Sequence, residues 1–141
     1  MGKAVTAKKK AAVKKDAARW KPEPEEHDFP AALDYLSLLM KPELASRVVD
    51  ELRKATATHR KARDLLRASE LLLLPASNPA VARDLKKVRQ GIKLSPVLLL
   101  RGDPAKGRRL MVADGYHRIC ASYSIDENLD IPCRIVDLPA R

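Results

Sequence analysis

The chain has 141 residues, 45% of them hydrophobic and only 4% aromatic, and its formal net charge is +10. This length fits one small domain rather than two, with a core built mostly of Leu, Val, Ile and Ala. The two cysteines are too few for a disulfide scaffold and lack the spacing of a zinc site, and no apolar run approaches the roughly 18–20 residues of a membrane span. These features, with no apolar stretch behind the first lysines, favour a cytoplasmic protein without membrane contact.

Most of the positive charge belongs to the N-terminal segment. Residues 1–19 hold seven basic side chains against one acid, Asp16, in an Ala/Lys-rich sequence. This composition predicts a disordered tail, and the alternative is weak, salt-sensitive, nonspecific binding of nucleic acid through residues 1–19. The proline-rich, acidic stretch that follows predicts an extended linker. We therefore expect a tail and linker over residues 1–27 and a single domain over residues 28–141.

Residues 28–55 predict a helical hairpin at the start of the domain. Asp28 is expected to cap a helix over about 30–40, with Pro30 in its first turn. Pro42 then begins a second helix, which places four apolar side chains on one face: Leu44, Val48, Val49 and Leu52. We expect the hairpin to pack on the domain. The alternative is that its leucines contact a partner or a second copy of the chain, forming an oligomer.

Residues 56–141 predict an α+β core with the order β-α-α-β-β-α-β and a small mixed sheet. Asn78 is expected to cap a helix over 79–90 that Gly91 ends. The other predicted elements are strands over 55–62, 94–102, 109–114 and 131–138, helices over 63–70 and 116–125, and a hairpin loop over 103–109.

Residues 112–121, VADGYHRICA, are the densest polar segment of the chain. Gly115 stands where a strand meets a helix, and it allows a positive φ and the close approach of a ligand. His117 and Arg118 fall in the first turn of that helix, where cations oppose the helix dipole but suit a bound anion, most simply a phosphate. The alternatives are that Asp114 is only an N-cap and that His117 only packs. Cys120 is expected to be an inert core thiol.

The segment from KLSPVLLLRG to RRLMVADGYHRICASYSIDENLDIPCRIV resembles the ParB N-terminal/sulfiredoxin-like superfamily. The shared pattern covers about residues 56–136. In ParB proteins the loop that matches residues 115–118 binds the phosphates of CTP, and in sulfiredoxins it binds those of ATP. The resemblance implies a ParB/sulfiredoxin-like fold and a CTP or ATP ligand, with or without Mg²⁺. Asp114, Gly115, Tyr116, His117 and Arg118 would form the binding loop, and Lys93 and Ser95 at the strand entrance would be secondary contacts.

Several departures from these families narrow the expected activity. Tyr116 stands where sulfiredoxins carry their reactive cysteine, so we expect no reduction of sulfinic acids. The sulfiredoxin-like Asp-Pro-Ala-Lys element corresponds to residues 78–81, where the lysine is replaced by Val81, and Arg83 or Lys86 could substitute only with a different geometry. The chain has no room after residue 136 for the helix-turn-helix domain of ParB, so chromosome partitioning is not expected.

Four functions remain open on this evidence. The first is a protein that binds a nucleotide or phosphate through Gly115, His117 and Arg118, with Asp114 capping the helix or aiding a metal ion. The second is a phosphotransferase, NTPase or nuclease in which His117 is the general acid or base, although the sequence offers no clear pair of carboxylates for Mg²⁺. The third is a DNA-associated factor acting through the basic tail, and the fourth is a partner-binding protein.

Overall fold

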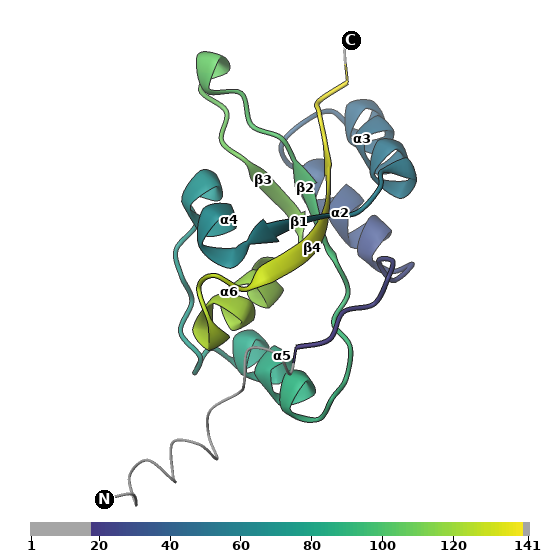
Figure 1. Ribbon diagram of the computed structural model, residues 1–141. Helices are drawn as coiled ribbons and strands as arrows, with labels where there is room; N and C mark the ends of the chain where they lie inside the picture. The colour runs from purple at the N-terminus through teal and green to yellow at the C-terminus, as the bar shows by residue number, and fades with distance from the viewer. Residues whose placement is uncertain (1–17, 140–141) are drawn as a thin grey trace, which may run out of the picture.

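The computed structural model describes residues 18–139 and shows a mixed α+β fold (Figure 1). Residues 1–17, which hold most of the predicted basic tail, lie outside the described part. The helices are α2 (Asp28–Leu36), α3 (Pro42–Lys54), α4 (Ala62–Ser69), α5 (Pro79–Arg89) and α6 (Tyr116–Ile125), with a short 3₁₀ helix at Pro104–Lys106. The strands are β1 (Thr58–Lys61), β2 (Val97–Leu100), β3 (Met111–Asp114) and β4 (Asp130–Val136). The predicted element order from residue 56 onward is confirmed.

The four strands form one mixed sheet in the order β1-β4-β2-β3. β2 runs parallel to β4, and the two outer pairs are antiparallel. All four residues of β2 are buried, as expected for an inner strand covered on both faces, which reads as a continuous apolar run. Thus VLLL is the central segment of the sheet, and β3 lies at one edge.

Helices cover both faces of the sheet (Figure 1). Val97 and Leu99 face a core that includes residues of α4, α5 and α6, whereas Leu98 and Leu100 face a core that includes residues of α2 and α3. The alternation follows from the period of two in a strand. The apolar faces of the predicted helical hairpin are therefore domain core, and the expectation that the hairpin packs on the domain is confirmed.

The start of the helical hairpin differs from the prediction. The first helix covers 28–36 rather than 30–40, and Asp28 is not its cap. The N-cap is His27, which makes no side-chain capping bond, while the carboxylate of Asp28 accepts hydrogen bonds from the Glu25 N–H and the Ser95 hydroxyl. The Asp28 carboxylate, which the sequence predicted as the helix cap, is instead bonded to Ser95, a residue distant in the chain. At the other end, the Ser37 hydroxyl bonds back to the Leu33 carbonyl where the helix stops.

The predicted signals at the ends of α5 are confirmed. The side-chain oxygen of Asn78 accepts hydrogen bonds from the N–H groups of Ala80 at 3.0 Å and Val81 at 3.2 Å. Gly91 follows the helix with a φ of +75°, a conformation that favours glycine. Within residues 18–139, no helix is long and apolar enough to cross a membrane.

Leu98→Ala should destabilise the protein strongly, because Leu98 is fully buried between the sheet and the α2–α3 layer. The free energy of unfolding should fall by about 2–5 kcal/mol in chemical denaturation. Leu38→Ala is the matched control, since Leu38 is 83% exposed and its loss should cost less than about 0.5 kcal/mol. Equal losses in the two variants would contradict the described core.

Candidate functional site

The junction between β3 and α6 requires a glycine at position 115. Gly115 has a φ of +113° and is the N-cap of α6. A Cβ added to it would lie 2.4 Å from Cγ1 of Val97, far closer than van der Waals contact allows. The sequence suggested that a ligand approaches Gly115 closely. In the structure, the group that lies against this glycine is the Val97 side chain of β2. Glycine at this position is needed for the fold whether or not a ligand binds.

The first turn of α6 presents backbone donors that have no acceptor within the described residues. The first bond of the helix runs from the Ile119 N–H to the Gly115 carbonyl at 3.0 Å, which leaves the N–H groups of residues 116–118 without a partner there. No side chain caps this end, and the first turn contains no acid. The N-cap interpretation of Asp114 is therefore wrong. Its carboxylate accepts instead from the Arg118 guanidinium at 2.8 Å, a hydrogen bond in which both partners are ionised groups.

Arg118 is held between the ends of two strands. Its side chain is 17% exposed and pairs with Asp114, which is 18% exposed. The same Nη2 atom lies 3.4 Å from the Pro96 carbonyl, while the buried Nε has no hydrogen-bond partner in the structure. The guanidinium is thus fixed in place by hydrogen bonds from Nη2 to two different strand ends.

Aspartates from three elements surround Arg118. Burial raises the pKa of Asp114, the Arg118 guanidinium opposes that rise, and the carboxyl of Asp28 adds to it by charge repulsion and hydrogen bonding. Burial also raises the pKa of Asp84 on α5, and the largest opposing effect is again the charge of Arg118. The sequence showed no paired carboxylates, yet tertiary folding brings Asp28 close enough to Asp114 to raise its pKa. The only available signal was an acid at the start of an apolar helix, which suggested a cap.

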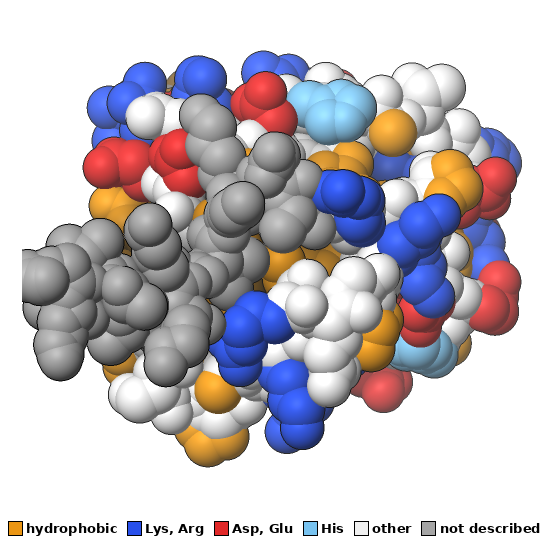
Figure 2. All heavy atoms as spheres, turned by 60° about the horizontal axis from the view of Figure 1, so that its bottom comes forward, with side chains coloured by type: hydrophobic (Ala, Val, Ile, Leu, Met, Phe, Trp, Pro, Cys, Tyr) orange, Lys and Arg blue, Asp and Glu red, His pale blue; other side chains and the backbone are white. Residues whose placement is uncertain are grey.

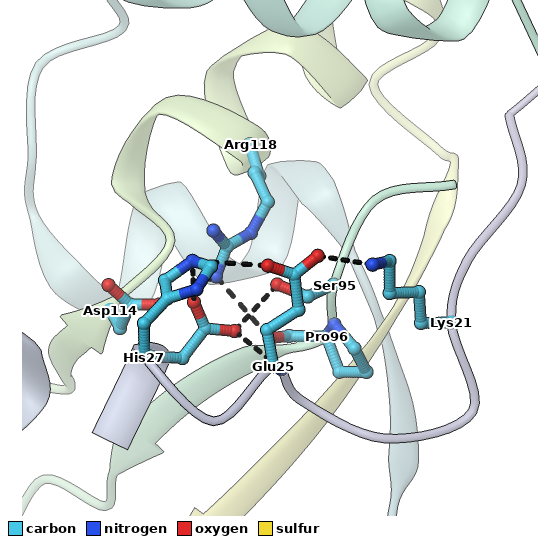
Figure 3. A network of polar contacts seen from close by, with 8 residues as sticks. Lys21, Glu25, His27, Ser95, Pro96, Asp114 and Arg118 are labelled. Atoms are coloured by element: carbon cyan, nitrogen blue, oxygen red, sulfur yellow. Dashed lines mark hydrogen bonds and ion pairs between the residues drawn. The ribbon is translucent and has the colours of Figure 1, made fainter. Parts of the chain in front are cut away.

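The segment before α2 lies over this cluster (Figure 3). Its backbone pairs with residue 94 through the Lys21 N–H to the Leu94 carbonyl at 2.8 Å, and the Lys21 ammonium binds the Glu25 carboxylate. Nε2 of His27 lies 3.1 Å from Oε2 of Glu25 and 3.4 Å from Oδ1 of Asp28. The predicted linker is therefore partly packed against the domain, and we call residues 19–27 the strap.

The other predicted site residues differ in their surroundings. His117 is exposed, and its ring centroid lies 5.5 Å from that of Tyr116, so it is not a buried packing residue. The Tyr116 hydroxyl donates to the Leu72 carbonyl. Lys93 is exposed, whereas Ser95 is buried and its hydroxyl donates to Asp28 at 2.6 Å. Ser95 therefore supports the aspartate cluster and does not face the exposed turn.

The two thiols behave as expected for core residues. Cys120 and Cys133 are both buried and free. Burial raises the pKa of the Cys120 thiol and raises that of Cys133 to about 11, so both are protonated near neutral pH. Among the described residues, no group of three or more His, Cys, Asp or Glu side chains could hold a metal ion.

The face at the bottom of the molecule carries mixed charge (Figure 2). Lys and Arg side chains are spread over it, with Asp and Glu side chains between them. The charges of Arg118, Lys87, His117 and Arg83 oppose the rise in the pKa of Asp84. The charge around Asp84 therefore comes from several specific side chains rather than from a uniform positive surface.

Gly115→Ala should destabilise the fold by about 2–5 kcal/mol in chemical denaturation. A left-handed φ costs an alanine about 1–3 kcal/mol, and the clash with Val97 adds an overpacking cost of roughly similar size. Gly107→Ala measures the cost of the left-handed φ alone, because Gly107 has a φ of +69° but nothing within 4 Å of an added Cβ. Equal costs for the two variants would show that Val97 does not restrict position 115.

The raised pKa of Asp114 predicts a pH effect on stability. In the folded protein Asp114 keeps its proton above the ordinary value of 3.8, so the free energy of unfolding falls as pH rises from 3.8 through the folded pKa. Asp114→Asn removes this titration. Its stability relative to wild type should therefore rise across that interval in denaturation series at several pH values. Asp50→Asn, at an exposed position on α3, is the control. If the stability of Asp114→Asn followed pH in parallel with that of wild type, the raised pKa of Asp114 would be contradicted.

Comparisons with family models, curated proteins and solved structures found no match to this chain. The α+β architecture is thus a finding of the structure itself, and the resemblance to the ParB/sulfiredoxin-like superfamily stays a prediction.

Proposed function

We propose that this protein binds a nucleotide or another phosphate ligand at the first turn of α6. The observation that carries the proposal is the set of three N–H groups at residues 116–118, which have no acceptor within residues 18–139, next to the guanidinium of Arg118. Oriented amides at a helix N-terminus and an arginine are both strong donors to phosphate oxygens. His117 is exposed on the same turn and would add a third donor when protonated.

The surrounding acids restrict how such a ligand binds. Asp114 already neutralises much of the charge of Arg118, and the buried Asp28 lies behind it. A phosphate would compete with Asp114 for the guanidinium, or its charge would be reduced by Mg²⁺. Mg²⁺ often uses only one or two protein carboxylates together with ligand phosphates, so a dedicated cage of protein ligands is not needed. Asp114, with Asp28 behind it, is the residue that would contact such a cation.

A nucleotide-dependent enzyme is the second candidate, and the nearness of the Asp28 and Asp114 carboxyls favours it. His117, at the exposed end of the same turn, would be the general acid or base. Turnover of labelled nucleotides with and without Mg²⁺ separates this candidate from binding alone. The DNA-associated role of the tail concerns residues outside the described part and stays a prediction.

The binding proposal predicts that CTP, ATP or inorganic phosphate at millimolar concentration raises the melting temperature, with or without Mg²⁺. A ligand at about 100 times its Kd adds roughly 2.7 kcal/mol to the free energy of unfolding, which is several degrees. No shift in wild type with any of the three ligands would overturn the proposal.

Removing Arg118 alone would leave Asp114 as an unpaired, partly buried charge and would damage the fold. The variant that tests the site therefore changes both partners of the ion pair. Asp114→Asn combined with Arg118→Gln replaces the ion pair by two neutral amides of similar shape. We expect this double variant and His117→Ala to weaken binding in calorimetry, the double variant by tenfold or more. Arg60→Ala, at an exposed position on the opposite edge strand, should bind like wild type.

A further inference from the structure

The β2–β3 hairpin carries a second group of cations. Residues 101–110 contain four basic side chains against one acid, Asp103, and they project beyond the sheet at the top of Figure 1. Arg67 of α4 lies beside them, because it shares a cavity lining with the hairpin. We define the hairpin surface by five residues: Arg67, Arg101, Lys106, Arg108 and Arg109. It lies away from α5, which is at the bottom of the same view.

Two adjoining cavities open along the hairpin surface. Their volumes are about 630 and 580 Å³, and both are lined by Arg101, Gly102 and Arg108. Five basic and three acidic side chains line them together. The shape is therefore an extended trough with a net positive lining, rather than a closed pocket for one small molecule.

Of the five cations that line this trough, two, Lys106 and Arg108, form no ion pair within residues 18–139. Arg101 pairs with Asp137 at 2.8 Å, and Arg109 lies 3.6 Å from Glu70. Arg108 has no ion pair among the described residues, and its buried Nε has no hydrogen-bond partner. A half-buried guanidinium without a counter-charge suits an anion in the trough, because a charge-assisted hydrogen bond would stabilise the pair.

An apolar groove continues from the hairpin surface. A cavity of about 380 Å³ is lined by Tyr35, Leu39 and Leu71, and it shares Arg108 and Arg109 with the trough. Tyr35 is 43% exposed and Leu39 is 49% exposed. An aromatic and an aliphatic side chain thus lie open to solvent within reach of the same arginines.

We propose that the hairpin surface binds the backbone of a single-stranded nucleic acid, with a base inserted in the groove beside Tyr35. Several arginines lining one trough suit the phosphates of a nucleic-acid backbone, and an exposed aromatic ring offers a stacking platform. Only an unstacked, unpaired base can enter such a groove, so a single strand fits where a duplex does not. This binding is independent of the phosphate site at α6, because no residue of the hairpin surface belongs to it.

The test of the hairpin surface uses the full-length chain with Lys8, Lys9, Lys10, Lys14 and Lys15 changed to Gln, so that tail lysines contribute little. Binding of a short labelled oligothymidylate is measured by fluorescence anisotropy over a range of salt. Arg108→Gln with Arg109→Gln should weaken binding by roughly tenfold or more at low salt. It should also reduce the slope of log K against log salt by about 1.4, at roughly 0.7 for each lost phosphate contact.

The matched control, Arg60→Ala with Arg89→Ala, removes two exposed arginines outside the hairpin surface. It should leave both the affinity and the slope close to those of the parent. Equal losses in the two double variants would overturn the proposal, since attraction by overall charge would then explain the binding. Arg108 is half-buried, so its substitution can also disturb the fold. A second pair, Arg67→Gln with Arg109→Gln, repeats the test at two exposed positions and leaves Arg108 unchanged. An affinity unchanged in this second pair would also overturn the proposal.

The base-binding part has its own readout. Tyr35→Ala should weaken oligothymidylate binding by roughly fivefold or more, because stacking on an aromatic ring contributes about 1–3 kcal/mol per base. Tyr35→Phe keeps the ring and should bind like the parent. A duplex of the same length that binds as tightly as the single strand, or a Tyr35→Ala variant that loses nothing, would overturn the assignment to a single strand.

Discussion

The polar cluster around Arg118 is the interaction on which the arrangement of this protein depends. Arg118 on α6 pairs with Asp114 at the end of β3 and reaches the carbonyl of Pro96 before β2. Behind it, Asp28 at the start of α2 accepts the Ser95 hydroxyl. These bonds connect both helical layers through the end of the sheet. Buried polar groups are costly unless each has a partner, so the cluster favours one relative placement of the elements that supply it.

The same cluster decides what chemistry the α6 turn can support. A bare helix N-terminus with an arginine attracts any small anion, but here the arginine already has a carboxylate partner. The strap adds Glu25 and His27 over the cluster, so the acids and bases near Arg118 come from segments far apart in sequence. Under the proposed function, ligand binding at this turn would be a competition between a phosphate and the protein's own carboxylates. Ligand charge and Mg²⁺ would shift that competition, and so would the protonation of Asp114, whose pKa burial raises.

The hairpin surface has a different physical character. At α6 the cation has a carboxylate partner, and three backbone donors have no acceptor in the described part of the chain. At the hairpin, Arg108 has no ion pair in that same part and lines an open trough. Compact, directional donors suit a terminal phosphate group, and spaced arginines beside an apolar groove suit a polymer of phosphates. The positive charge of the chain is thus not confined to the N-terminal segment, although the composition of residues 1–19 draws attention there first.

Local signals in the sequence determined the elements of this protein and part of its site. Apolar spacing, β-branched residues and turn residues together predicted the order of the core helices and strands, and Asn78 and Gly91 marked the ends of α5, because these signals act within a few residues. Gly115, His117 and Arg118 were likewise placed correctly at a strand–helix junction. Tertiary structure alone decided their partners. It moved Asp28 from a cap to a buried acceptor, paired Asp114 with Arg118, committed Ser95 to the cluster and brought Arg67 beside the hairpin. Such contacts join residues distant in the chain, and their free energies depend on burial and on competing partners that no local pattern records.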